Sequence, residues 1–248
     1  MGTSLSTDRA FDEPNDHVLP IAVAGTARLG QNRGMAQPGA VRSIEELRQI
    51  YRSPSQGALD KVIDRLDGHC RTFIEHSPFL ILATAARDGG CDVSPKGGPP
   101  GFVQVIDDHH VALADLSGNN RLDSMQNLLS NRGVAILFMI PGLDETLRVN
   151  GEATISTDPQ LRERCRVESK TPHVVVLIDV AEAYIHCAKA LRRGGVWSPD
   201  SWPDVGNMPS VACMLKDHVN ARGVSADQLE VALEADYART LWEPGGGE

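Results

Sequence analysis

Polar residues follow apolar segments at four places in this sequence, and their types suit anion binding better than acid–base catalysis. The clearest place is residues 117–124, Ser-Gly-Asn-Asn-Arg-Leu-Asp-Ser, between an apolar run and a short helical pattern. A helix start offers free backbone N–H groups, Gly118 permits close approach, and the Arg121 guanidinium can bond two oxygens of one anion. These groups would hold a phosphate, although a capped loop without a ligand is the other interpretation.

Three further polar segments have related properties. Residues 92–101 form a Pro- and Gly-rich loop with a single cation, Lys96. Residues 145–150, Glu-Thr-Leu-Arg-Val-Asn, alternate so that polar side chains fall on both faces of a predicted strand, which is costly unless a ligand or partner satisfies them. Residues 189–193, Lys-Ala-Leu-Arg-Arg, concentrate positive charge in an acidic chain, and a solvated basic turn is their alternative interpretation.

Motifs of other chemistries are absent from the sequence. It contains no Gly-x-Gly-x-x-Gly, P-loop, Gly-x-Ser-x-Gly or His-Glu-x-x-His pattern, so we assign no catalytic residue. The five cysteines are odd in number and lie at least 21 residues apart, which favours reduced thiols and no metal site. His186 and Cys187 are neighbours on a predicted strand and point to opposite faces, so a shared site is not expected.

Composition restricts the partners. Hydrophobic residues make up 41% and charged residues 23%, as in globular proteins, and no apolar run approaches the roughly 18 residues of a membrane-spanning helix. The net charge of −9 disfavours nucleic acid. The apolar residues 18–24 follow acidic residues instead of the basic region of a secretory signal. We therefore expect a cytoplasmic protein that binds a small molecule and neither nucleic acid nor membrane.

The elements that must position these residues begin after a non-periodic stretch. We expect residues 1–42 to be a flexible N-terminal extension. A capping box at residues 43–46 predicts one helix, and a second box at residues 53–56 predicts another that continues with helical spacing to Ser77-Pro78. Near the other end, residues 209–242 predict two helices broken at Gly223.

Short strands occupy the middle of the chain. A brief helix is predicted at residues 121–129, and strands are predicted at residues 79–85, 91–94, 101–106, 110–116, 133–140, 146–155 and 174–185. Antiparallel strands with one inserted helix predict an α+β, mainly β, fold built on a small barrel.

Four motifs in the same order resemble the flavin-binding split β-barrel superfamily related to pyridoxamine 5′-phosphate oxidase. They are Phe79–Ala85, Asp92–Gly97, Gly118–Ser124 and Glu145–Gly151. Residues 186–193, followed by Trp197, are similar to a bacterial subfamily, which often has Arg where Lys96 stands. The resemblance implies a split β-barrel domain over residues 43–205 with N-terminal helices, and a C-terminal helical extension over residues 206–248.

The resemblance also implies an FMN site. The segment that holds the flavin phosphate corresponds to Asn120, Arg121 and Ser124. The strand beside the flavin ring and its ribityl chain carries Ser94 and Lys96.

Further cofactor contacts are implied from a strand that often crosses a homodimer interface and from a C-terminal segment. These residues are Glu145, Thr146 and Arg148 on the strand, and Lys189, Arg192 and Arg193 on the segment.

The implied activity is that of an FMN-dependent oxidoreductase acting on a small molecule, in which the flavin performs the hydride chemistry. Alternatives are an F420-dependent reductase, a flavin- or haem-binding protein without turnover, and a structural barrel whose basic loops are only solvated. Oxidation of pyridoxamine phosphate itself is not expected, because the basic C-terminal substrate-binding pattern is not found.

Overall fold

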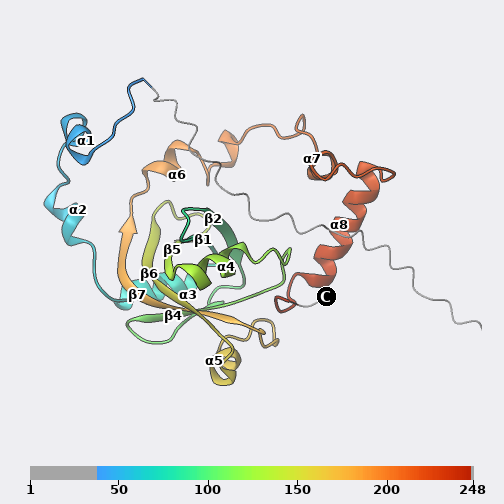
Figure 1. The fold of residues 1–248 in the computed structure, drawn as a ribbon, viewed down its shortest axis with the longest axis horizontal. Helices are drawn as coiled ribbons and strands as arrows, with labels where there is room; N and C mark the ends of the chain where they lie inside the picture. The colour runs from blue at the N-terminus through green and yellow to red at the C-terminus, as the bar shows by residue number, and fades with distance from the viewer. Residues whose placement is uncertain (1–37, 247–248) are drawn as a thin grey trace, which may run out of the picture.

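The computed structural model describes residues 38–246, so most of the predicted flexible extension, residues 1–42, lies outside the described residues. Seven antiparallel strands form one sheet in the order β2-β1-β5-β6-β7-β4-β3. The strands are β1 (Phe79–Ala85), β2 (Cys91–Gly97), β3 (Val103–Val105), β4 (His110–Ala114), β5 (Gly133–Met139), β6 (Thr146–Ser156) and β7 (Val175–His186). The sheet curves into a split β-barrel, which confirms the predicted α+β, mainly β, fold (Figure 1).

The long strands β6 and β7 hold the two parts of the barrel together. Their register shifts between Asn150 and Gly151, and such a bulge bends a strand and strengthens its twist. Gly151 is required at this bend, because a Cβ atom there would lie 2.0 Å from the carbonyl oxygen of Asp179. The core on the inner face includes fully buried Phe138, Leu147 and other apolar residues from every strand except β2.

Two helices cover parts of the sheet and contribute to the core. They are α3 (Gly68–His76), which buries Cys70 and Ile74, and α4 (Asp123–Ser130), which buries Leu128. Asp67 caps α3 by accepting a hydrogen bond of 2.8 Å from the Cys70 N–H. This bond holds the pKa of Asp67 below its ordinary value, because it favours the ionised carboxylate.

The long helix predicted from residue 53 to residue 76 is wrong, since the chain breaks between α2 (Gln56–Asp60) and α3. The reason is tertiary pairing. Ile63 forms a bridge with Ala183 of β7, and the Leu66 N–H donates to the carbonyl oxygen of Asp108 over 2.7 Å. These bonds satisfy the backbone outside a helix, whereas the apolar spacing alone favours one.

Most other elements agree with the predictions. The helices α1 (Ile44–Ile50), α7 (Val211–His218) and α8 (Ala226–Thr240) were expected, and α8 begins with a complete capping box of Ser225 and Gln228. The sequence did not predict α5 (Pro159–Arg164) or α6 (Lys189–Arg193). β2 runs three residues past its predicted end at Ser94, because an edge strand tolerates Pro95.

The chain returns to the barrel after α8 (Figure 1). We call residues Glu243–Gly245 the C-terminal strap. The Ser117 N–H donates to the carbonyl oxygen of Glu243 over 2.7 Å, and the Gly245 N–H donates to that of Asp115 over 3.1 Å. Between residues 38 and 246, no helix is both long and apolar enough to cross a bilayer.

Candidate functional site

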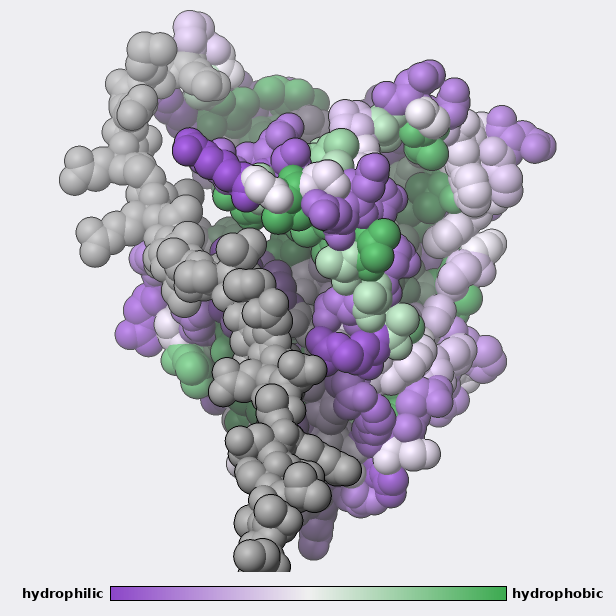
Figure 2. Space-filling view, turned by 90° about the vertical axis from the view of Figure 1, so that its right-hand side faces the viewer, coloured by the Kyte–Doolittle hydropathy of each residue, from purple (hydrophilic) through white to green (hydrophobic). Residues whose placement is uncertain are grey.

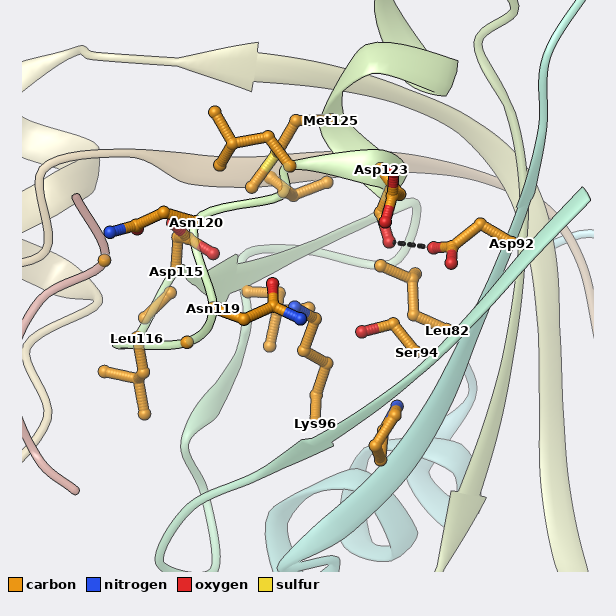
Figure 3. A pocket seen from close by; sticks show the side chains of 18 of the residues that line it. Leu82, Asp92, Ser94, Lys96, Asp115, Leu116, Asn119, Asn120, Asp123 and Met125 are labelled. Carbon is orange, nitrogen blue, oxygen red and sulfur yellow. Dashed lines mark hydrogen bonds between the residues drawn. The ribbon is translucent and has the colours of Figure 1, made fainter. Parts of the chain in front are cut away.

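A cavity of about 250 Å³ lies between β2, the end of β4 and the start of α4 (Figure 3). Four of the predicted cofactor residues line it: Ser94, Lys96, Asn120 and Ser124. The lining also includes three carboxylate residues that the prediction did not include, and these are Asp92, Asp115 and Asp123.

The N-terminus of α4 supplies unpartnered backbone donors to this cavity. Its N-cap residue, Leu122, has a φ of 59° and provides no side-chain hydrogen bond to the helix. Asn120 also has a positive φ, 52°, which Asn tolerates better than most residues. An uncapped helix start carries free N–H groups and the positive end of the helix dipole, so it favours an anion.

Lys96 provides the cation of the cavity. It extends from β2 toward Asn119 in Figure 3. The positive charge of Lys96 also interacts with Asp115, the residue directly after β4. Burial raises the pKa of the Asp115 carboxyl, and the positive charge of Lys96 partly offsets this rise. The positive charge of Lys96 thus balances part of the negative charge of Asp115 in the cavity.

The other two carboxylates are each engaged by a neighbour. Asp92 accepts a hydrogen bond from the Ser124 hydroxyl, which is buried at the first turn of α4. Asp123 accepts from the Arg121 Nε over 2.7 Å. Arg121 is exposed and does not line the cavity, so the structure places this predicted phosphate ligand at the outer side of the loop.

The C-terminal strap forms part of the cavity wall. Gly245 is buried and lines the cavity, and a Cβ atom at this position would lie 2.1 Å from the Asp115 Oδ2 atom. The strap is also held by an ion pair between Glu243 and Lys170. Gly245, which is 130 positions after Asp115 in the sequence, therefore covers the Asp115 carboxyl.

The predicted residues of β6 lie on the other face of the sheet. Ser94 of β2 pairs with Leu82 of β1, Leu82 pairs with Ile136 of β5, and Ile136 pairs with Val149 of β6. The residue of β6 in line with Ser94 is therefore Val149, whose side chain is buried in the core. Thr146 and Arg148 alternate with the core positions, so both belong to the outer face. Arg148 is partly exposed there, Thr146 is buried, and Glu145 precedes β6. One subunit thus does not bring these residues to the cavity.

The predicted basic segment forms α6 and lies near the turn between β5 and β6. Lys189, Arg192 and Arg193 are exposed, and none of them lines the cavity. The Arg192 Nε donates to Asp144 over 2.8 Å, and the Trp197 indole N–H donates to the carbonyl oxygen of Leu143 over 2.9 Å. These two contacts fix α6 and the residues after it to the β5–β6 turn.

Sequence reasoning missed Asp115 and Gly245 as cavity residues. Asp115 had a local signal, since it is a carboxylate at the end of an apolar strand and directly before the polar segment 117–124. Gly245 had no local sequence signal, because its position beside the cavity depends on the path of the chain through α7 and α8. Within the described part of the chain, no group of three or more His, Cys, Asp or Glu side chains is arranged to hold a metal ion.

Comparison with known proteins gives one family. Residues 66–187, which include all seven strands, match the family model described as pyridoxamine 5′-phosphate oxidase. No curated protein sequence matches the chain significantly.

Solved structures with a similar fold share little sequence with this chain. HupZ from Group A Streptococcus is 18% identical with a TM-score of 0.40, over 48% of this chain and 92% of that chain. A Clostridium acetobutylicum protein related to general stress protein 26, of the pyridoxinephosphate oxidase family, is 15% identical with a TM-score of 0.37, over 48% and 85%. An F420 reductase is 18% identical with a TM-score of 0.34, over 46% and 94%.

Proposed function

Because this chain belongs to the split β-barrel superfamily related to pyridoxamine 5′-phosphate oxidase, we propose that it is an FMN-dependent oxidoreductase acting on a small molecule. The observation that carries this proposal is the cavity that brings the uncapped N-terminus of α4 together with Lys96. A phosphate needs such donors, and the net charge of −9 makes a local positive site necessary.

The lining residues fit a flavin mononucleotide. Three carboxylates would repel a phosphate, but each is moderated in its own way. Asp123 is paired with Arg121, Asp92 accepts a hydrogen bond from Ser124, and Asp115 lies within the field of the Lys96 charge. The free donors that remain are the backbone of α4, Lys96 and the amide side chains of the loop.

Each residue then has a role that its chemistry supports. A bound flavin would supply the hydride chemistry. The N–H groups of α4 and the Asn120 amide would hold the phosphate, and Arg121 would keep the Asp123 carboxylate paired beside it. Lys96 and Ser94 would lie beside the ring and the ribityl chain, where the Lys96 charge favours the anionic reduced ring.

Two observations support a homodimer with the flavin between its subunits. The cavity of about 250 Å³ is smaller than the range of about 300–1,000 Å³ usual for ligand sites of this kind, so one subunit encloses only part of a flavin. Arg148 is partly exposed on the outer face, where it could reach a flavin held mainly by a second subunit. Lys189, Arg192 and Arg193 would approach from the same side.

The test of the cofactor is its release from purified full-length protein. We expect a yellow protein that releases FMN, identified by absorbance and mass. Flavin-free protein should bind FMN at least about tenfold more tightly than riboflavin, because charge-assisted hydrogen bonds to the phosphate contribute roughly 1.5–3 kcal/mol. Equal affinity for the two flavins would place the phosphate outside the cavity, and no binding of either would reject the proposal.

Two alternatives are outcomes of the same experiment. Release of F420 would identify a deazaflavin-dependent reductase. Release of haem, or a bound flavin that no donor reduces, would identify a binding protein without turnover. Sedimentation of the FMN-loaded protein tests the homodimer, and full occupancy in a monomer would contradict it.

A further inference from the structure

Four side chains on the outer face of β6 and β7 form a positively charged group around one phenol ring. We call Lys61, Arg148, Tyr184 and His186 the Tyr184 cluster. Arg148 and Tyr184 are cross-strand partners, and the Arg148 Nη1 donates to the Tyr184 hydroxyl over 3.1 Å. The Arg148 Cζ lies 5.7 Å from the centre of the Tyr184 ring.

Lys61 and His186 complete the cluster from two other directions. The Lys61 Nζ lies 5.2 Å from the centre of the Tyr184 ring and donates to the carbonyl oxygen of Ile185 over 2.9 Å. The His186 ring centre lies 6.4 Å from that of Tyr184, two residues further along the same face of β7. The segment after α2, held to β7 by the Ile63 bridge, brings Lys61 to this place.

The charge of this cluster is not balanced locally. In the described part of the chain, the ion pairs include neither Lys61 nor Arg148. Glu182, two residues before Tyr184 on the same face, accepts a hydrogen bond of 2.6 Å from the Asn150 amide and is in none of these ion pairs. Two cations next to one ring repel each other, and an anion between them would relieve this repulsion.

His186 shows the effect of the two cations. Its Nδ1 atom is buried and has no hydrogen-bond partner among the described residues, although buried polar atoms are nearly always satisfied. Burial lowers the pKa of His186, and the charges of Arg148 and Lys61 lower it further. An anion bound at the accessible side of the cluster would offset both charges.

We propose that the Tyr184 cluster binds the oxyanion, carboxylate or phosphate, of the substrate. This inference rests on the proposed function, because the cluster lies outside the cavity of its own subunit and would face a flavin only across the proposed homodimer interface. It adds Lys61, Tyr184 and His186 to the site and assigns the substrate to the class of small anions. Lys61 acts by charge, Arg148 by charge and a directed N–H, and Tyr184 by fixing the positions of both.

The experiment titrates FMN-loaded, full-length protein with inorganic phosphate and, separately, with acetate at constant ionic strength. The signal is the imidazole NMR resonance of His186, assigned by its loss in His186→Gln. We expect a saturable shift with at least one anion, and the preferred anion distinguishes a phosphate from a carboxylate. Lys61→Met should weaken this binding by about fivefold or more, as expected for loss of a charged partner, whereas Lys61→Arg should retain it.

Matched controls separate this proposal from that of the cofactor. Lys216→Met changes a cation on α7, far from the cluster in Figure 1, and should leave the anion affinity unchanged. FMN affinity should be unaltered in Lys61→Met, whose side chain is exposed. A non-saturating shift, an unchanged affinity in Lys61→Met, or binding only to the flavin-free protein would overturn the proposal, and the last result would assign the cluster to the cofactor instead.

Discussion

The barrel and its flanking helices are held in different ways. In the barrel, β1 and β5 alternate between buried and partly exposed side chains, and Leu80, Ile136 and Phe138 are almost completely buried. The helices α1, α2, α6 and α8 bury no residue, and α7 buries only Ala212. Since burial of apolar surface is the main favourable term in folding, the barrel carries most of the stability of the chain.

The segment that follows α8 nevertheless reaches the candidate site. Figure 2, which views the side of α7 and α8, shows hydrophobic side chains exposed among hydrophilic ones. The exposed residues of α7 and α8 include Met214, Val231 and Tyr237. Beyond α8, however, the C-terminal strap is bonded to the barrel and Gly245 is buried beside Asp115. Weak burial of a helix therefore does not mean that the segment after it is without a role.

The largest effect should come from the barrel core. Phe138→Ala should lower the free energy of unfolding by about 3–5 kcal/mol, because it removes a fully buried ring and leaves a cavity. Val231→Ala, on exposed α8, should change it by less than about 0.5 kcal/mol. Urea denaturation followed by circular dichroism measures both. A comparable loss in the two variants would show that α8 belongs to the same cooperative unit through contacts that one subunit lacks.

The second prediction compares a barrel residue with a residue of a flanking helix by their effects on FMN binding. Lys96→Met should weaken FMN binding by about 1.5–3 kcal/mol, because it removes the cation of the cavity. Lys189→Met, on α6, should have a smaller effect, since it can reach a flavin only at a subunit interface. Flavin fluorescence titration compares them at equal protein concentration. The reverse order would move the main cationic contact from the barrel to the flanking segment.

The third effect tests the contact between the two regions. Gly245→Ala should destabilise the protein by about 1–3 kcal/mol, because its Cβ atom overlaps the Asp115 carboxyl. Gly118→Ala serves as the control in the same cavity lining, where a Cβ atom meets nothing within 4 Å. Thermal unfolding of both flavin-free variants measures the difference. Equal melting temperatures would mean that the C-terminal strap does not rest on Asp115 in solution.

The smallest effect concerns the cap of α3. Asp67→Ala should cost about 1 kcal/mol, as for other N-caps. Because the folded pKa of Asp67 is lowered, its ionised form stabilises the fold at neutral pH, and this contribution disappears as the pH falls through the folded pKa. Asp67→Asn should keep the cap and lose that part of the acid dependence. Urea denaturation between neutral and acidic pH distinguishes the two, and parallel curves for wild type and Asp67→Asn would contradict the assignment.

The sequence by itself determined the elements whose pattern is local. Strands β1 and β5 are continuous apolar runs between turn residues, so their bounds agree with the prediction almost to the residue. The box of Ser225 and Gln228 fixed the start of α8, because both hydrogen bonds join residues three apart. Within the site, the polar segment 117–124 and Lys96 were found from residue types alone.

Only the tertiary structure decided what depends on distant partners. The helical pattern through residues 61–67 gives way because Ile63 pairs with β7. Arg121 turns to Asp123 and leaves the cavity to backbone donors, and Gly245 reaches Asp115 from the far end of the chain. Spacing along the chain predicts local hydrogen bonds and the face of each strand. It does not specify which faces meet in space, because that depends on sheet curvature and on the path of every segment between them.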